Sequence, residues 1–324
     1  MRRTWAKCTA AILAGGLLLA ACGDGDDDGG NGSAGGNTPG GAALSGDIRI
    51  DGSSTVTPLI SLAAEDFQTE NPGVRVTVGT SGTGGGFEKF CNGETDFSMA
   101  SRAIKDGETQ ACAAKGIQPL ELIVANDGLS VVVNTENDWA ECLTVAQLKA
   151  IWEPGSTVSN WNQVDPSFPN QKLTLFGAGS DSGTFDYFTG EINGEEGATR
   201  TDYNPSEDDN VTVRGVSGDR GAMGYFGLSY LLENEGKVKG VEIDGGEGCV
   251  APTVETVQSG DYEPLGRPLF IYVKAAAAQR PEVQAFAEYY IENQESITEE
   301  ALFVPLTDEQ VTKATADLAA ITGG

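Results

Sequence analysis

The sequence predicts an α/β protein made of two lobes, and three observations lead to this prediction. Patterns typical of strands and helices alternate from residue 47 onward, as in open sheets of parallel type with helices on both faces. Residues 46–324 are long enough for two domains. The chain also leaves the first lobe near residue 126 and returns later, so we expect residues 46–126 plus 255–324 in one lobe and 127–254 in the other.

The first lobe should begin with a strand at 47–51 and a helix that Ser54 or Thr55 caps. Pro58 falls in the first helical turn, where proline is well accommodated. The buried face of this helix would consist of Leu59, Leu62, Ala63 and Phe67. Further strands are expected at 74–80 and 96–100, and further helices at 85–90 and 110–115.

Residues 121–134 contain two apolar runs, 122–125 and 129–133, which Asn126-Asp127-Gly128 separates. We interpret this segment as the chain passing from one lobe to the other. Gly128 would supply a hinge there without steric cost.

The second lobe should start with a helix at 144–152, which Thr144 caps, followed by an irregular stretch at 153–170. A strand at 173–176 then leads into a helix from Ser182 onward. Later strands are expected at 211–216, 222–227 and 238–243, with a short helix at 253–259. The return comprises a strand at 268–273, a helix at 281–294 with Val283, Phe286, Tyr289 and Tyr290 inward, and a last helix at 309–321 capped by Thr307.

The N-terminus resembles an export signal. Basic residues open it, and residues 10–21 are apolar but shorter than the roughly 20 residues of a membrane-spanning helix. We expect a signal peptide at 1–21, because small residues lead directly into Cys22 as in a bacterial lipobox, where the cysteine is lipidated. A cleavable signal with a coincidental cysteine is the alternative. A Gly- and Asp-rich linker at 22–45 would then hold an exported protein to the membrane, in the periplasm or at the cell surface.

The chain is strongly acidic, with a net charge of −28. Residues 46–324 keep 17 basic and 44 acidic side chains after the three basic and four acidic ones of residues 1–45 are left out. Such a surface argues against nucleic acid and acidic lipid as partners. An anion site in this chain would have to depend on local dipoles and one or two buried cations.

Six cysteines are present, of which Cys8 lies in the signal and Cys22 at the anchor. The remaining four, an even number in an exported chain, predict disulfides. Three pairings are possible, and Cys91–Cys112 with Cys142–Cys249 is preferred because each bond then stays within one lobe. No metal site is expected, since the chain has neither histidine nor a CxxC pattern.

Three turns rich in Gly, Ser and Thr each follow a strand and precede a helix: 52–55, 82–86 and 182–184. Such turns leave backbone N–H groups available and let an anion approach closely. Each turn alone would be a simple helix cap, but three in one chain predict a single oxyanion held by helix ends. In sheets of this type, ligands bind beyond the carboxyl ends of the strands, where all three turns fall.

Two charged residues complete the expected site. Arg102 follows the strand at 96–100 and could bond a tetrahedral oxyanion through two N–H groups, although it could equally pair with a surface acid. Asp181 could accept the proton of hydrogen phosphate, which sulfate lacks at neutral pH, or simply cap the helix. An acceptor of this kind would select phosphate over sulfate.

Enzymatic function is not expected. A Ser-His-Asp triad is impossible without histidine, and neither a P-loop nor an SxxK motif is present. Nothing singles out two carboxylates as a glycosidase pair. We therefore expect no catalytic residue and no cofactor.

The motifs together resemble the substrate-binding proteins of high-affinity phosphate ABC transporters, the PstS type. The segments that carry the resemblance occur in the family's order: DGSSTV at 51–56, GTGGGFEKF at 82–90, DFSMASR at 96–102, SDSGTF at 180–185 and GAMGYF at 221–226. The resemblance implies a periplasmic-binding-protein fold of type II, with phosphate in the interlobe cleft of a monomer that delivers it to a membrane permease.

By motif, the resemblance assigns phosphate binding to residues of the three turns: Ser54, Thr55, Thr83, Gly84, Ser182, Gly183 and Thr184. The better-known branch of the family has an Asp at the end of the third strand and an Arg before Ser-Gly-Thr. Here Ser101-Arg102 and Ala178-Gly179 stand at those places, so we infer that Arg102 supplies the positive charge. Binding of sulfate or molybdate, a secreted phosphatase and a phosphate sensor remain the alternatives.

Overall fold

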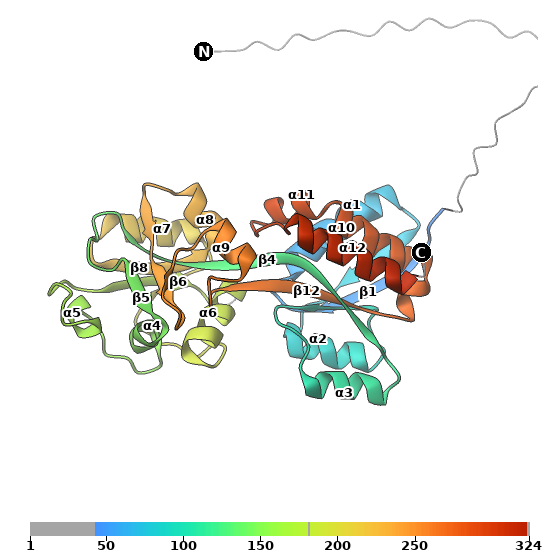
Figure 1. Cartoon of the computed structure of the whole chain (residues 1–324), viewed down its shortest axis with the longest axis horizontal. Helices are drawn as coiled ribbons and strands as arrows, with labels where there is room; N and C mark the ends of the chain where they lie inside the picture. Colours follow the sequence, from blue (N-terminus) through green and yellow to red (C-terminus); the bar gives the residue numbers. More distant parts are fainter. Residues whose placement is uncertain (1–42, 181, 323–324) are drawn as a thin grey trace, which may run out of the picture. The chain divides into compact units, whose positions relative to one another are not determined.

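The structure of the protein is a computed structural model, which describes residues 43–180 and 182–322 (Figure 1). The predicted signal peptide, Cys22 and nearly all of the linker lie outside the described residues, as does Asp181. Within the described ranges, no helix combines the length and the apolar character that crossing a bilayer requires.

A mixed sheet lies at the centre of the fold, in the strand order β2-β1-β3-β12-β4-β8-β6-β7, with β9 also paired to β4. Its strands are β1 (Gly46–Gly52), β2 (Val74–Val78), β3 (Phe97–Ala100), β4 (Pro119–Asn134), β6 (Thr174–Ala178), β7 (Asn204–Ser206), β8 (Ala222–Gly227), β9 (Val238–Gly240) and β12 (Gly266–Lys274). β12 is antiparallel to β3 and β4, and β4 is antiparallel to β8. The expectation of an all-parallel arrangement is therefore wrong at the centre, because the outgoing and returning strands run side by side in opposite directions.

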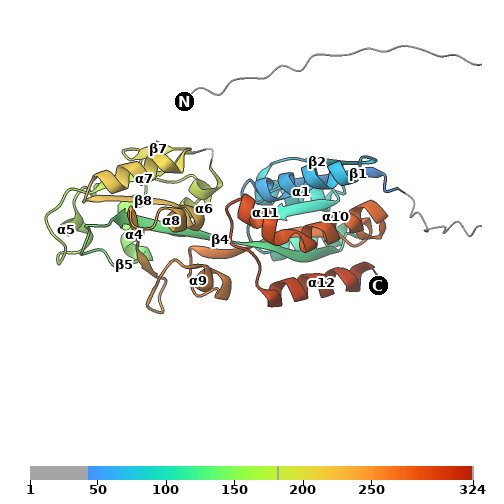
Figure 2. The same ribbon diagram turned by 90° about the horizontal axis from the view of Figure 1, so that it is seen from above.

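β4 and β12 lie together across the folded body in both views (Figure 2). Asn126-Asp127-Gly128 does not interrupt β4, because Asp127 pairs with Arg267 and Gly128 with Gly266 in the ladder. A Cβ at Gly128 would lie 2.7 Å from Val257 Cγ2, so close packing against helix α9 (Val254–Ser259) accounts for glycine here. Its role as a hinge stays a prediction.

The helices form separate groups around the sheet. Figure 1 shows α1 (Thr57–Glu70), α10 (Pro281–Glu292) and α12 (Asp308–Thr322) on one side of β1 and β12, with α2 (Gly82–Cys91) and α3 (Asp106–Ala114) on the other. Around β6 and β8 lie α4 (Val145–Trp152), α6 (Gly183–Asn193), α7 (Asp209–Gly218) and α8 (Leu228–Glu233). The shorter helices are α5 (Trp161–Val164), α11 (Gln294–Glu300) and the 3-10 helix η1 (Ala277–Gln279). Apolar side chains gather in two large clusters, one for each group, and a smaller one beneath α2 and α3.

Helix caps are among the confirmed predictions. Thr144 accepts the N–H of Gln147 at 3.1 Å, and Thr307 accepts that of Gln310 at 3.2 Å. Ser182, which the sequence predicts as the start of its helix and not as the cap, accepts the N–H of Thr184 at 3.2 Å. The predicted cap of α1 is wrong, since residues 54–56 form a turn and the helix begins at Thr57 with Val56 at its N-cap. The hydroxyls of Ser54 and Thr55 therefore do not cap the N-terminus of α1.

Two predicted strands are wrong. Residues 211–216 lie in α7, where Thr212, Val213 and Val216 are buried at helical spacing and Asp208 caps the start. Residues 238–243 divide at Val241 into β9 and β10 (Glu242–Asp244), which belong to different sheets. The α11 helix was not predicted, because Gln294–Glu300 lacks a clear apolar stripe.

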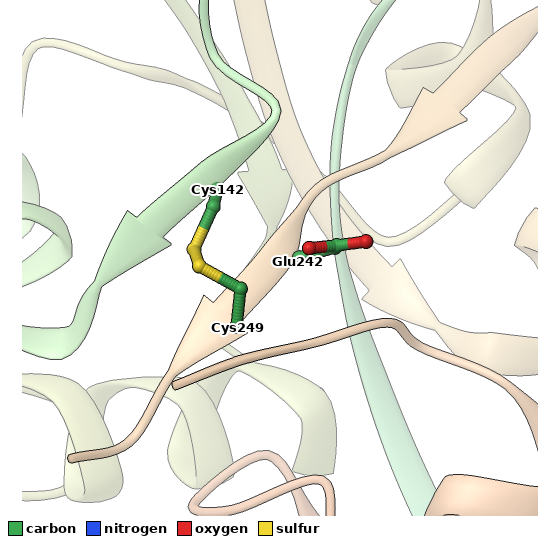
Figure 3. A group of neighbouring side chains, drawn as sticks. All are labelled: Cys142, Glu242 and Cys249. Carbon is green, nitrogen blue, oxygen red and sulfur yellow. A yellow bond between two sulfur atoms is a disulfide. The ribbon is translucent and has the colours of Figure 1, made fainter. Parts of the chain in front are cut away.

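Both predicted disulfides are confirmed. Cys91–Cys112 joins α2 to α3, and Cys142–Cys249 links the outer strands of a small sheet ordered β11-β10-β5, with β5 at Cys142–Thr144 and β11 at Cys249–Val250. Glu242 lies beside the second bond (Figure 3). Because the two sulfur atoms are bonded to each other, this group offers a metal ion only the carboxylate of Glu242.

Candidate functional site

The turn after β1 is fixed to the end of β3. A Cβ at Gly52 would lie 2.1 Å from the carbonyl oxygen of Met99, so only glycine allows this approach. The N–H of Ser53 donates to the same Met99 oxygen at 3.0 Å. Residues 53–55 are thereby held at the carboxyl edge of the strands.

The start of α2 is bound to the same edge. Asp51 accepts the Ser81 hydroxyl at 2.5 Å and the Lys89 ammonium at 2.6 Å. Burial opposes ionisation of Asp51, but these partners outweigh it and keep the pKa of its carboxyl below the ordinary value. The Thr83 and Ser101 hydroxyls lie 3.0 Å apart, which connects α2 to the residue that follows β3.

The start of α6 approaches the turn after β1 from the other side. A Cβ at Gly183 would lie 2.8 Å from Thr55 Oγ1 and 3.3 Å from Thr55 Cα. Glycine at this position therefore permits direct contact between the two turns.

The three predicted turns meet at a cavity of about 40 Å³. The prediction of a turn at 82–86 is wrong in detail, because α2 begins at Gly82 and includes these residues. Its lining comprises Ser53, Ser54, Thr55, Gly82, Thr83, Ser101, Gly183, Asp186, Tyr187, Glu196 and Arg267. Five of the residues predicted from the sequence thus come together: Ser54, Thr55, Thr83, Ser101 and Gly183. A space of this size suits a compact ion, and the N-termini of α2 and α6, both at the cavity, favour negative charge.

Other predicted residues lie beside the cavity without lining it. Gly84 and Thr184 each follow a lining residue within their helices, and Ser182 uses its hydroxyl to cap α6. Arg102 directs Nη1 and Nη2 to the carboxylate oxygens of Glu108, at 2.9 and 2.8 Å. The expected role of Arg102 in binding stays a prediction.

Arg267 is a lining residue that sequence reasoning missed. Its Nε and Nη2 lie 3.3 and 3.2 Å from Asp127 Oδ2 on the neighbouring strand, and its guanidinium lies 3.3 Å from the ring centre of Tyr187. Nη1 has no hydrogen-bond partner within residues 43–180 and 182–322. The sequence feature that could have indicated Arg267 is an acid, Asp127, and a base, Arg267, each next to a glycine, on the two strands that pass between the predicted lobes.

Two carboxylates also line the cavity, Asp186 and Glu196. Burial, and then the charge of Glu196, raise the pKa of Asp186 above its ordinary value. A carboxyl with this tendency can hold or accept a proton. Sequence reasoning missed Asp186 because an acid in the first turn of a helix is common, and it missed Glu196 because this residue lies after the end of α6, away from the recognised turns.

A mixed α/β fold in which hydroxyls, helix N-termini and a guanidinium surround a small cavity defines a binding protein for a compact oxyanion. The family model described as the PBP superfamily domain matches residues 37–294. Protein SphX of Synechococcus elongatus is 47% identical over 271 residues, which cover 83% of this chain and 80% of the relative. Phosphate-binding protein PstS of Staphylococcus saprophyticus is 38% identical over 280 residues, 86% of each chain.

A solved structure gives the same result. The crystal structure of a possible phosphate binding protein from Planctomyces limnophilus is 45% identical, with a TM-score of 0.83 over 86% of this chain and 99% of that one. The chain belongs to the PBP superfamily and, within it, to the PstS-type phosphate-binding proteins, a family of extracytoplasmic transport receptors rather than enzymes. The predicted family and fold class are confirmed.

Proposed function

We propose that this protein binds inorganic phosphate outside the cytoplasm and delivers it to the permease of an ABC transporter. The meeting of three turns at one cavity of about 40 Å³ is the observation that supports this function best. Phosphate would lie between two lobes, residues 46–126 plus 255–324 and residues 127–254. Closure of the lobes around the ion would present the bound form to the permease.

Binding would replace the hydration shell of the ion with donors of the protein. Ser54, Thr55, Thr83 and Ser101 would supply hydroxyls, and the starts of α2 and α6 would supply N–H groups, including those of Gly84 and Gly183. Ser182 and Thr184 could contribute as well, although the N–H of Ser182 donates to the Gly179 carbonyl and that of Thr184 to the Ser182 hydroxyl in this structure. Arg267 would supply the principal positive charge from within the cavity, and Arg102 a second one from its edge. Local cations of this kind are needed because the chain as a whole repels anions.

Selectivity would come from carboxyl groups that accept the proton of hydrogen phosphate. Asp186 and Glu196 line the cavity, and Asp181 remains a candidate from the sequence. Sulfate at neutral pH has no proton to donate, so its oxygen would face a carboxylate oxygen without a hydrogen bond between them.

Competition calorimetry at neutral pH tests this function. Phosphate should bind at one site per chain, and sulfate or molybdate should fail to displace it at equal concentration. Equal competition by sulfate would exclude a proton acceptor and favour a general oxyanion-binding protein. Turnover of a chromogenic phosphate ester would instead indicate a phosphatase.

A pair of glycine variants tests whether the turns must meet. Gly183→Ala places a methyl group against Thr55, so phosphate affinity should fall about tenfold or more. Gly218→Ala is the matched control, because nothing lies within 4 Å of an added Cβ there and Gly218 does not line the cavity. Equal affinities of the two variants would show that contact between the turns is unimportant for binding.

Attachment to the membrane through lipidated Cys22 belongs to the same proposal. The Cys22→Ala variant, expressed in a bacterium that processes lipoproteins, should appear in the soluble extracytoplasmic fraction while the parent stays with membranes. Retention of the variant in the membrane fraction would contradict lipid anchoring. We also propose that the protein is a monomer, which sedimentation analysis of the phosphate-bound form would check.

A further inference from the structure

A second group of cations lies on the exposed face of β1 and β2, and it shares no residue with the cavity described above. Ile48 and Ile50 point into the core, so Asp47 and Arg49 fall on the opposite face. The parallel register places Asp47 beside Arg75 and Arg49 beside Thr77. Together with Arg280, these four residues line a cavity of about 520 Å³.

Two of the three arginines of this face, Arg49 and Arg75, differ from most other arginines among the described residues. Of the eight arginines in the described ranges, five form ion pairs with acids: Arg102, Arg200, Arg220, Arg267 and Arg280. Arg49, Arg75 and Arg214 form none with a described residue, and two of these three line this one cavity. Acids outnumber bases by 44 to 17 in residues 46–324, yet Asp47 is the one described acid that lines the cavity with these two arginines, and it forms no close ion pair with either of them.

Two buried acids near this face, Asp96 and Glu282, form ion pairs with Arg280. Arg280 donates to Asp96 at 2.7 Å and to Glu282 at 2.8 Å, and these two side chains are only 8% and 11% exposed. Asp96 also accepts the backbone N–H of Arg49 at 2.9 Å. Buried acids thus fix the guanidinium of Arg280, which is itself 37% exposed, while Asp47 remains as the acid on the exposed side.

Lys274, which does not line this cavity, is close enough to interact with the charge of Arg49. Burial lowers the pKa of the Lys274 ammonium below its ordinary value, the charge of Asp96 opposes this shift, and the charge of Arg49 adds to it. In the ladder of β1 and β2, Asp47 lies opposite Arg75, which favours pairing of the two strands, whereas Arg49 lies opposite Thr77 and has no acid across from it. A bound anion would compensate the charge of Arg49.

We propose that Arg49, Arg75 and Arg280, with the Thr77 hydroxyl, form a second oxyanion-binding site that takes phosphoryl groups. Guanidinium groups bond such oxygens in pairs. The cavity of about 520 Å³ admits a group larger than orthophosphate, such as pyrophosphate or a phospholipid head group. The site is open to solvent, so its affinity should be low and should fall as salt is added. This site goes beyond the transport function and does not depend on it.

Calorimetry with pyrophosphate tests the site in the full chain, saturated with phosphate, at low ionic strength. The R49Q/R75Q variant should bind pyrophosphate at least tenfold more weakly than the parent. R214Q/K149Q removes the same charge from exposed positions elsewhere and should leave binding unchanged. Equal pyrophosphate affinity of the two double variants would overturn the proposal. R267M should retain pyrophosphate binding even if it loses phosphate, which separates this site from the transport cavity.

Sedimentation with vesicles identifies the source of the phosphoryl group. The full-length parent and R49Q/R75Q carry the same N-terminus, so a difference between them reports this face alone. Weaker binding of R49Q/R75Q to phosphatidylglycerol vesicles, with no difference on phosphatidylcholine, would identify a lipid head group. If the parent and R49Q/R75Q bind equally to each kind of vesicle, while R49Q/R75Q binds pyrophosphate more weakly, the natural ligand is a soluble phosphate compound.

Discussion

Two arginine–carboxylate pairs lie at or beside the cavity that the three predicted turns line, and the two guanidinium groups make different hydrogen bonds. Arg102 binds both oxygens of Glu108, and Nη1 also donates to the Ala103 carbonyl at 3.1 Å. Arg267 binds a single oxygen of Asp127 at longer distances and leaves Nη1 without a partner among the described residues. Both terminal nitrogens of Arg102 thus donate hydrogen bonds within the protein. Nη1 of Arg267 makes no such bond to a described residue and can donate to a ligand in the cavity.

The two pairs also differ in how far they are buried and in how the pKa of each carboxyl shifts. The side chains of Arg102 and Glu108 are 33% and 20% exposed, against 17% and 13% for Arg267 and Asp127. Burial opposes ionisation of Glu108, but the hydrogen bonds from Arg102 and Lys105 outweigh it and lower its pKa. At Asp127 burial outweighs Arg267 and raises the pKa. The ionised form is therefore less favoured at Asp127 than at Glu108, although Arg267 and Asp127 still form an ion pair.

The largest expected effect is that of Arg267→Met. Removing the cation from a largely desolvated cavity should cost about 2 kcal/mol or more of phosphate binding, roughly thirtyfold in the dissociation constant. Titration calorimetry measures it. An unchanged affinity would remove Arg267 from the site and reverse the comparison of the two pairs.

A control separates binding from folding in this experiment. Arg267→Met leaves the buried Asp127 carboxylate without its partner, which by itself should lower the free energy of unfolding. The double variant D127N/R267M removes the uncompensated charge and should recover stability without recovering phosphate affinity. Recovery of both would mean that Arg267 acts through the fold alone.

The second prediction uses pH to distinguish the pairs, through opposite slopes of stability. Glu108 has a lowered pKa in the folded state, so its contribution is present above its ordinary value of 4.5 and disappears as pH falls through the folded pKa. Asp127 has a raised pKa, so stability decreases as pH rises from its ordinary value of 3.8 through the folded pKa.

Urea unfolding of two variants measures these slopes. Glu108→Gln should be about 1 kcal/mol less stable than the parent at neutral pH, with the difference vanishing in acid. Asp127→Asn should lose the decrease in stability that the parent shows above the ordinary pKa of Asp127. Parallel stability curves for the two variants would show that the pairs are electrostatically alike.

Local chemistry explains which features could be predicted from the sequence. Thr144 and Thr307 could be predicted as caps because a hydroxyl at a helix start bonds a nearby N–H whatever the rest of the chain does. The disulfides followed from keeping each pair within one lobe, and the three turns from small residues after apolar runs. The caps and turns depend on residues that are neighbours in the sequence, and the disulfides depend on the number of cysteines and their positions along the chain.

Features that depend on distant neighbours could not be predicted. The antiparallel placement of β12 between β3 and β4 arises from long-range pairing that no local pattern encodes. The α7 segment contains β-branched residues, but packing of Val213 and Val216 in the core overrides their strand propensity. Arg267 was missed for the same reason, because it reaches the cavity from the returning strand rather than from one of the recognised turns.

The smallest expected effect is that of Arg102→Ala, which should weaken phosphate binding by about 0.5–1 kcal/mol because a partly exposed guanidinium already held by Glu108 contributes mainly through its charge. Glu108→Gln should act in the opposite direction and tighten binding about twofold, since it leaves the Arg102 charge without its acidic partner. Added salt should reduce both changes, as expected for charges near solvent. If Arg102→Ala instead matched Arg267→Met, Glu108 would have to release Arg102 when phosphate binds, and the difference between the two pairs would exist only in the absence of phosphate.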